Sequence, residues 1–244
     1  MIGILIALLI LAAAAYYLLI ITEGTYLGTR IVVLLYDWVA YKYDRMKKLR
    51  PVYESFFLGI PLAEALREVP HPRVLDVATG TGRLPRALGA EWDGRGLIVG
   101  VDRSERMVAL AQKATQGPGV FFLRADAERL CFAEASFDAV TCLEALEFVT
   151  KPRRAIHEMY RVLKPGGIAL VSNRVGPDAW LFPGRAAGRG RLEKLLREEG
   201  FEHVTTRRWQ VHYDLIWACK GTPQGIVASV FCNEGNVSRK DCAE

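Results

Sequence analysis

The sequence predicts an α/β fold, a doubly wound and mostly parallel seven-stranded sheet, preceded by an N-terminal transmembrane helix. Three observations support this prediction. From Arg73 onward, short apolar strands alternate with helical stretches, a pattern typical of parallel sheets covered on both faces. A turn that contains two glycines directly follows the first of these strands. The chain also opens with an uncharged apolar run from Ile2 to Ile21.

Residues 1–22 are expected to form a membrane anchor. An α-helix rises about 1.5 Å per residue, so roughly 20 residues cross a hydrocarbon core of about 30 Å. The first ionisable side chain is Glu23. A cleavable signal peptide is the alternative, because Ala12–Ala15 offers small residues for cleavage. The lack of a basic segment before a long apolar run favours a retained span.

Residues 23–72 are expected to be a basic juxtamembrane segment followed by an entry helix. Positive side chains outnumber acidic ones between Arg30 and Arg50. Because positive flanks stay cytoplasmic, we expect a single-pass protein of the cell membrane whose globular domain faces the cytoplasm. Residues 30–49 suit either an amphipathic helix on anionic headgroups or a helix packed on the domain. A further helix is expected from Tyr53 to Glu68.

Residues 73–220 are expected to form the main domain, and residues 221–244 a loosely ordered tail rich in small and polar residues. Seven segments are predicted strands: Val74–Ala78, Gly96–Val101, Val120–Arg124, Phe137–Leu143, Gly167–Ser172, 203–209 and 213–220. Four segments between them are predicted helices: Leu84–Leu88, Glu105–Gln116, Arg153–Leu163 and Leu192–Glu199. A turn is expected at Lys164–Gly167, before the fifth strand.

Composition bounds the class of protein and its partners. The 244 residues are 51% hydrophobic and 24% charged, a balance typical of one sizeable globular domain with appendages. The net charge of +5 suits an anionic surface, but no basic run interleaved with aromatic residues is present, so no nucleic-acid partner is expected. The five cysteines are odd in number and lack C-x-x-C spacing, which predicts reduced thiols and no metal site.

The stretch VLDVATGTGRLP, residues 74–85, predicts a ligand close to the backbone. Gly80 and Gly82 permit a positive φ and leave no Cβ in the way. In a doubly wound sheet this turn lies at the carboxyl edge, where ligands bind. Asp102 ends the next strand, where a carboxylate can accept both hydroxyls of a ribose. The alternative role for Asp102 is a helix cap, although Ser104 is the better candidate for that role.

The residues in and before this turn distinguish between two classes of nucleotide-binding site. A nicotinamide dinucleotide site is expected to read G-x-G-x-x-G, and the third glycine is missing here. Asp76 precedes the turn, and its carboxylate would repel a pyrophosphate but suits a ligand with an ammonium group. The residues therefore favour a nucleoside with a nearby cation, and a nicotinamide-dependent oxidoreductase is the less favoured alternative.

Four motifs occur in order: LDVATGTG, GVDRS, DAERLCF…SFDAVTC and EMYRVLKPGG. Together they resemble class I S-adenosylmethionine-dependent methyltransferases of the ubiquinone/menaquinone-biosynthesis (methyltransferase type 11) type, over roughly residues 36–220. The resemblance implies a Rossmann-like sheet, S-adenosylmethionine as cofactor, and methyl transfer to a small acceptor. Combined with the membrane anchor, it favours a hydrophobic acceptor such as a quinone precursor or a lipid. A catalytically silent protein that binds S-adenosylmethionine at a membrane is the alternative.

The resemblance also implies a set of residues that contact the cofactor: Asp76, Ala78, Thr79, Gly80, Gly82, Asp102, Arg103, Met107, Asp126, Ala127 and Leu143. In this arrangement Asp76 would reach the methionine ammonium, Asp102 the ribose hydroxyls and Asp126 the adenine amino group. Ala78 departs from the broader class, which has glycine at that position.

An acceptor that must first lose a proton needs a general base. Glu144, Glu147 and His212 are the candidates for this role. Residues 173–190 contain Trp180 and Phe182 and interrupt the core pattern after the fifth strand. This segment is expected either to cover the acceptor pocket or to be a surface loop.

Overall fold

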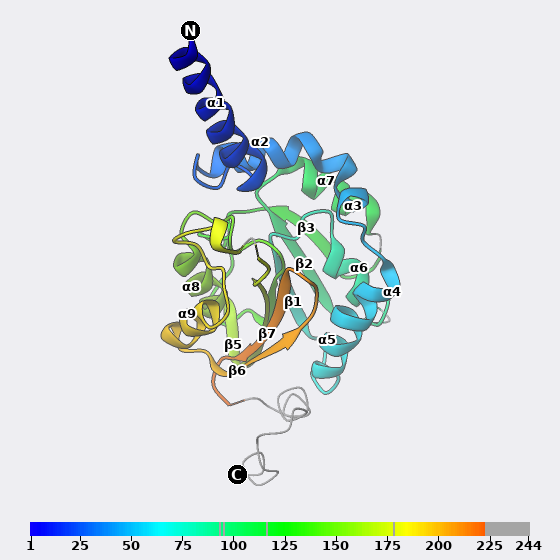
Figure 1. Ribbon diagram of the computed structural model, residues 1–244. Helices are drawn as coiled ribbons and strands as arrows, with labels where there is room; N and C mark the ends of the chain where they lie inside the picture. The colour runs from blue at the N-terminus through cyan, green and yellow to red at the C-terminus, as the bar shows by residue number, and fades with distance from the viewer. Residues whose placement is uncertain (93, 95, 116, 178, 223–244) are drawn as a thin grey trace.

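A seven-stranded sheet with the strand order β3-β2-β1-β4-β5-β7-β6 forms the centre of the molecule (Figure 1). The computed structural model describes residues 1–222 except 93, 95, 116 and 178. The strands are β1 Arg73–Val77, β2 Leu97–Asp102, β3 Val120–Arg124, β4 Phe137–Cys142, β5 Leu163–Arg174, β6 Glu202–Arg208 and β7 Tyr213–Cys219. β1 to β5 pair in parallel, and β7 runs antiparallel to β5 and β6. The predicted mostly parallel seven-stranded sheet is confirmed.

Helices cover both faces of this sheet, as a doubly wound fold requires (Figure 1). They are α5 Ile60–Ala65, α6 Arg83–Gly89, α7 Glu105–Ala114, α8 Pro152–Val162 and α9 Arg191–Glu199. Leu75 and Val77 belong to the core cluster that includes α8 and α9, whereas Val74 belongs to the cluster that includes α5 and α6. Because successive strand side chains point to opposite faces, the central strands are buried on both sides and appear in the sequence as continuous apolar runs.

The predicted turn at Lys164–Gly167 lies inside a strand. β5 begins at Leu163, and its pairing with β4 is irregular between Phe137 and Ala139. Gly167 sits so close to β4 that a Cβ there would lie 2.9 Å from the carbonyl oxygen of Asp138. The two glycines therefore allow an irregular strand pairing at this point, and the expectation of a separate turn is wrong.

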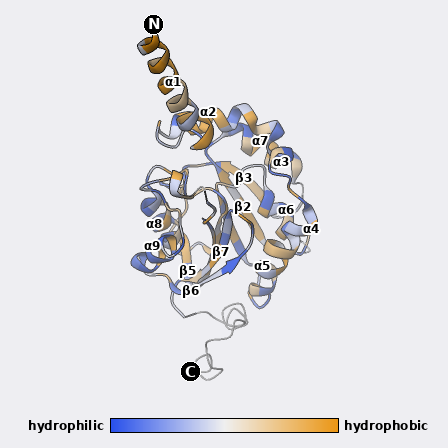
Figure 2. Ribbon diagram, viewed as in Figure 1, coloured by the Kyte–Doolittle hydropathy of each residue, from blue (hydrophilic) through white to orange (hydrophobic). Residues whose placement is uncertain are grey.

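The chain begins with a long exposed helix. α1, Ile2–Tyr16, continues into a π-helical turn, η1, Tyr17–Ile21. These 20 residues have a mean hydropathy of 2.9 and are not buried against the domain. In Figures 1 and 2 the helix rises away from the body as a predominantly hydrophobic ribbon. Its length and composition fit a membrane span, and an N-terminal signal sequence has the same properties.

The juxtamembrane segment packs on the domain as a series of short helices. α2 Thr29–Val39, η2 Ala40–Lys42 and α3 Tyr43–Met46 come first, and α4 Pro51–Glu54 and η3 Ser55–Gly59 lead into α5. The Arg106 guanidinium donates to the carbonyl oxygen of Asp37 at 3.0 Å, and the Asp37 carboxylate accepts from the hydroxyl of Ser104. α2 is therefore held against the start of α7. The helix expected at 53–68 is present as a continuous helical segment from Pro51 to Ala65, with the π-helical turn η3 in its middle.

Candidate cofactor pocket

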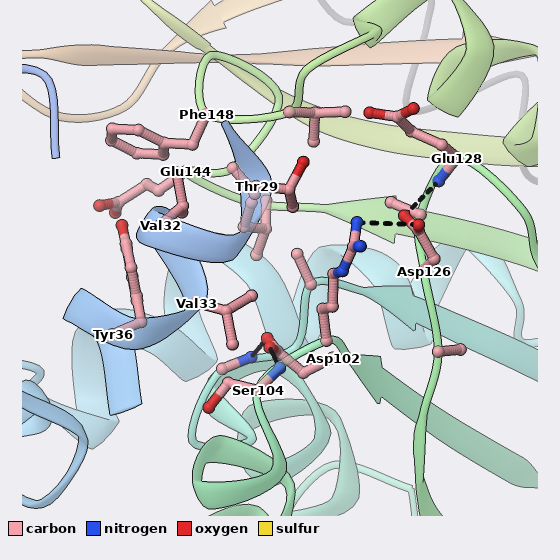
Figure 3. Close-up of a pocket in the computed structure, with 18 of the residues that line it drawn as sticks. Thr29, Val32, Val33, Tyr36, Asp102, Ser104, Asp126, Glu128, Glu144 and Phe148 are labelled. Atoms are coloured by element: carbon pink, nitrogen blue, oxygen red, sulfur yellow. Dashed lines mark hydrogen bonds and ion pairs between the residues drawn. The ribbon is translucent and has the colours of Figure 1, made fainter. Parts of the chain in front are cut away.

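A pocket opens at the carboxyl edge of β1, β2, β3 and β4, beneath α2 (Figure 3). Its cavity volume is about 120 Å³, and it is open to solvent at its mouth. The predicted site residues that line it are Ala78, Gly80, Asp102, Arg103, Asp126, Ala127, Leu143 and Glu144. The structure thus brings together residues from four strand ends that are far apart in the sequence.

Asp102 is held in place by backbone amides on both of its carboxylate oxygens. Gly80 N–H donates to Oδ2 at 2.9 Å, and Ser104 N–H donates to Oδ1 at 2.8 Å. Burial raises the pKa of Asp102, and the two amides oppose that rise. Each oxygen keeps accepting capacity, because a carboxylate oxygen has two lone pairs. The cap of α7 is Ser104, whose Oγ accepts from Met107 N–H at 3.0 Å.

An ion pair borders another part of the pocket. The Arg103 guanidinium lies 2.9 Å from Oδ2 of Asp126, and Glu128 N–H donates to Oδ1 at 3.0 Å (Figure 3). Ala127 lines the pocket next to this pair. Arg103 and Asp126, both predicted to contact the cofactor, are therefore ion-paired with each other at the pocket wall. This part of the wall therefore carries side chains of both charge signs.

Two residues that are not glycine adopt left-handed backbone at neighbouring strand ends. Ala78 has φ +55° and Glu144 has φ +50°. This conformation costs an L-residue about 1–2 kcal/mol. Ala78 and Glu144 follow β1 and β4, and both line the pocket. Such backbone is often found at functional sites, where the surrounding structure compensates for its cost.

Four predicted cofactor residues lie behind the pocket wall: Asp76, Thr79, Gly82 and Met107. Gly82, at φ +82°, faces α7, and a Cβ there would lie 3.0 Å from Thr115 Oγ1. Met107 is 1% exposed. The reason for these two residue types is therefore backbone conformation and core packing, not a place on the pocket wall.

Asp76 and Thr79 are buried beneath the glycine turn. Asp76 accepts a hydrogen bond of 2.6 Å from the hydroxyl of Thr141, and burial raises the pKa of Asp76 to about 6. Thr79 N–H donates to the carbonyl oxygen of Val101 at 2.9 Å, which ties the turn to β2. In the structure both residues support the turn from below.

The Glu144 carboxylate lies at the centre of an ion-pair network. It lies 2.8 Å from Lys47 Nζ and 2.6 Å from Arg83 Nη1, and it accepts from the Gln210 amide at 3.2 Å. Burial alone would raise its pKa, but Lys47 and Arg83 outweigh burial and hold the pKa below its ordinary value. A general base works best with a pKa near the working pH. The ion pairs therefore argue against this role for Glu144.

Glu147 lies outside the pocket wall and is fully buried. The Tyr213 hydroxyl donates to its Oε1 at 2.5 Å, and Arg174 Nη1 lies 3.6 Å away. Burial raises the pKa of Glu147 to about 7. His212 is not among the lining residues either. The predicted candidates for a general base therefore have different surroundings. Glu144 lines the pocket but is ion-paired, whereas Glu147 and His212 do not line the pocket.

The roof of the pocket was not among the predicted site residues. α2 supplies Thr29, Val32, Val33 and Tyr36 to the wall, and Phe148 supplies an aromatic ring (Figure 3). The spacing 29, 32, 33, 36 is the i, i+3, i+4, i+7 pattern of one helix face. That pattern was available as a signal for a buried face, but it does not say which part of the domain the face covers.

Comparisons with known proteins agree with this geometry. A family model described as a methyltransferase domain matches residues 75–171. A demethylmenaquinone methyltransferase of Clavibacter sepedonicus is 37% identical over 57% of this chain and 56% of its own length. One from Thermus thermophilus is 41% identical over 61% of this chain and 68% of its own length. The chain spans less than two thirds of the first of these relatives.

The fold also matches solved structures. A Haloferax volcanii protein, solved in complex with the methyltransferase activator Trm112, has a TM-score of 0.62 and 20% identity, covering 78% of this chain and 97% of its own. At that identity the likeness shows the fold alone. S-adenosylmethionine, the predicted cofactor, is the cofactor of the family indicated by the sequence matches. The chain belongs to the class I S-adenosylmethionine-dependent methyltransferases of the ubiquinone/menaquinone-biosynthesis type.

Proposed function

We propose that this protein transfers a methyl group from S-adenosylmethionine to a small hydrophobic acceptor, a quinone precursor of the kind named for its relatives. The observation that carries the proposal is the Asp102 carboxylate, fixed by two backbone amides at the wall of a pocket that is otherwise largely apolar. A fixed carboxylate at the end of the second strand suits a ribose. The apolar remainder suits an acceptor with little charge.

Different residues would bind different parts of S-adenosylmethionine. Asp102 would hold the ribose, the Arg103–Asp126 pair would border the adenine, and Asp76 would attract the ammonium group from beneath the turn. The bound cofactor supplies a methyl group on a sulfonium, which is already activated, so positioning accounts for much of the rate. These roles rest on the family resemblance together with the positions described above.

Glu144 would act as a positioning residue. Its ion pairs with Lys47 and Arg83 connect the region just after α3 and the start of α6 to the end of β4. Arg83 also pairs with Glu54 on α4 at 2.5 Å. We propose that this network keeps the entry helices closed over the methyl-transfer end of the pocket. An acceptor proton would then leave to another base or to water.

The N-terminal helix would tether the enzyme to the membrane. We propose that residues 2–21 cross the bilayer and that the domain lies on the cytoplasmic side, next to the basic segment. A tether of this kind keeps the pocket close to acceptors dissolved in the membrane. The tether would bring the pocket close to a lipid acceptor in the same way as to an isoprenoid quinone precursor.

The decisive experiment is transfer of a labelled methyl group. Full-length protein is incubated with labelled S-adenosylmethionine and the quinone, lipid and aqueous fractions of membranes, and mass spectrometry identifies the product. We expect label in the quinone fraction. Equal transfer with delipidated extracts would exclude a membrane acceptor. Tight binding of S-adenosylhomocysteine without transfer to any fraction would instead support a silent binding protein.

A further inference from the structure

α2 has two faces with opposite surroundings. Val32, Val33 and Tyr36 line the pocket, whereas Leu34 and Trp38 on the other side are 62% and 70% exposed. Tyr41, in the η2 turn that follows, is 68% exposed. The spacing 34, 38, 41 repeats every three or four residues, which keeps these side chains on one side of a helix. A cluster of large exposed apolar side chains of this kind marks an interaction surface.

This surface is joined rigidly to the anchor. Gly24, at φ +74°, lies so close to α2 that a Cβ there would be 2.8 Å from Ile31 Cγ2 and 3.2 Å from Leu35 Cδ1. Thr22 and Thr25 are buried in the same turn. Figure 1 shows that α1 extends away from the domain and that α2 lies across the C-terminal end of this first helix. Because the connecting turn is short and packed, α2 must lie close to any membrane that α1 crosses.

A second segment is hydrogen-bonded to residues at the C-terminal end of the anchor helix and in the turn after it. The Tyr17 hydroxyl donates to the carbonyl oxygen of Leu181 at 2.8 Å, and the Tyr26 hydroxyl donates to that of Pro183 at 2.9 Å. Leu181 ends a short helical turn, η4, Ala179–Leu181. Trp180 within this turn is 77% exposed. Exposed tryptophans therefore occur on both segments that are held at the end of the anchor.

The chemistry of these segments fits an anionic bilayer surface. Tryptophan and tyrosine rings favour the boundary between headgroups and hydrocarbon. Arg30, Lys42 and Arg45 are exposed on the same stretch of chain. Basic side chains next to a span are attracted to anionic lipids. Apolar, aromatic and basic groups are thus combined in the way that an interfacial helix requires.

We infer that α2 and η4 rest in the headgroup layer of an anionic phospholipid bilayer, so that the helix forming the roof of the pocket is also the membrane contact. This inference rests on the proposed membrane anchor. Its consequence is that the pocket lies directly beneath the membrane surface, on the other side of a single helix. An acceptor with an apolar tail could then reach the pocket without crossing bulk water.

The test is quenching of tryptophan fluorescence by lipids brominated at defined depths. Full-length protein is reconstituted into vesicles of phosphatidylcholine and phosphatidylglycerol, and wild type is compared with Trp38→Phe and Trp180→Phe. Trp92 and Trp217 are buried and Trp209 is half-buried, and all three are present in every variant, so they form a common background that is subtracted. We expect each variant to lose a measurable part of the quenching, with shallow bromines more effective than deep ones. If both substitutions leave the quenching unchanged, the inference is overturned.

Two control variants each carry one new tryptophan in the Trp38→Phe, Trp180→Phe background. They show how a tryptophan inside the bilayer and one far from it respond, so every outcome is decisive. Leu9→Trp lies within α1 and must be quenched by deep bromines; without that quenching the anchor is not inserted and the inference fails. Glu68→Trp lies before β1, at the opposite edge of the sheet, and must stay unquenched. Protection of Trp38 in detergent that increases with protein concentration would assign the surface to a second copy of the chain. Binding of S-adenosylhomocysteine, measured separately, reports on the proposed function whatever the quenching shows.

Discussion

The two sides of the pocket are built in different ways. The cofactor side comprises the ends of β1, β2 and β3, and its contacts span short separations, such as the Gly80–Asp102 and Asp102–Ser104 hydrogen bonds, which join residues 22 and 2 apart. The roof depends on contacts between distant segments, such as the 2.6 Å hydrogen bond between the hydroxyls of Thr29 and Thr150. The family model covers residues 75–171, which include the cofactor side but not α2. The family model thus includes the cofactor side and, of the roof, only Phe148.

The largest expected effect concerns the cofactor side. Asp102→Ala removes a carboxylate proposed to hold the ribose, and hydrogen bonds to charged groups contribute about 1.5–3 kcal/mol each. We expect binding of S-adenosylhomocysteine, measured by calorimetry, to weaken by roughly 100-fold. Asp102→Asn, which keeps an oxygen for one of the amides, separates folding from binding. Glu105→Ala, at a highly exposed carboxylate, is the control and should bind normally. Unchanged binding by Asp102→Ala would refute this assignment.

The next prediction distinguishes a roof network from a general base. If Glu144 acts by holding Lys47, then Glu144→Gln and Lys47→Met should each lower kcat, by roughly tenfold, and the double variant should be little worse than either. If Glu144 is instead the base, only Glu144→Gln should abolish transfer. Steady-state kinetics of the three variants decide between these roles. Arg153→Gln breaks an exposed ion pair with Glu198 and should have no effect.

The third prediction uses the raised pKa of Asp76, about 6. Only the ionised carboxylate attracts an ammonium group, and the ionised fraction rises about tenfold between pH 5 and pH 7 for such a pKa. The affinity for S-adenosylmethionine should therefore increase several-fold over this range. Asp76→Asn should bind more weakly at pH 7 and lose most of this pH dependence. Titration calorimetry at both pH values measures the difference, and an identical pH profile in the variant would exclude Asp76 as its source.

The smallest effect concerns the core behind the roof. The pKa of Glu147 is about 7 in the folded protein, against an ordinary value of 4.5. Between these values the folded state holds a proton that the unfolded state has lost, so the free energy of unfolding falls as the pH rises from about 5 to 7 and then levels off. Glu147→Gln should lack this fall and gain on the order of 1 kcal/mol relative to wild type at pH 8. Denaturation of the full chain at pH 5 and pH 8 checks this. A constant difference between the two proteins would contradict it.

Much of the fold could be predicted because strand and helix periodicity are local properties. β3 has the predicted bounds, β4 and β7 end one residue earlier than predicted, and β1 and β2 are each shifted by one residue. Cys142 and Cys219 are buried free thiols and Cys131 is an exposed one, whereas Cys232 and Cys242 lie outside the described residues, as does the predicted tail from 223 onward. The irregular start of β5 was not predictable, because a glycine pair has the same appearance in a turn and in a bulge.

The candidate site was predictable to the extent that it lies at strand ends. Asp102, Asp126 and Ala78 line the pocket because the carboxyl ends of parallel strands meet at one edge. Gly82 and Met107 belong to the same motifs but face the core. A motif identifies residue types that the local backbone needs, and it does not separate those that touch a ligand from those that support the backbone.

The sequence by itself determined the order of strands and helices, the apolar N-terminal helix and the acidic ends of β1 and β2. These depend on periodicity and on glycine and carboxylate positions within a few residues. Only the tertiary structure decided that α2 covers the pocket, that Glu144 is neutralised by Lys47 and Arg83, and that Glu147 is sealed beside Tyr213. Those features join segments up to 121 residues apart, as for Thr29 and Thr150. Their energies depend on burial and on partners that no short stretch of sequence specifies.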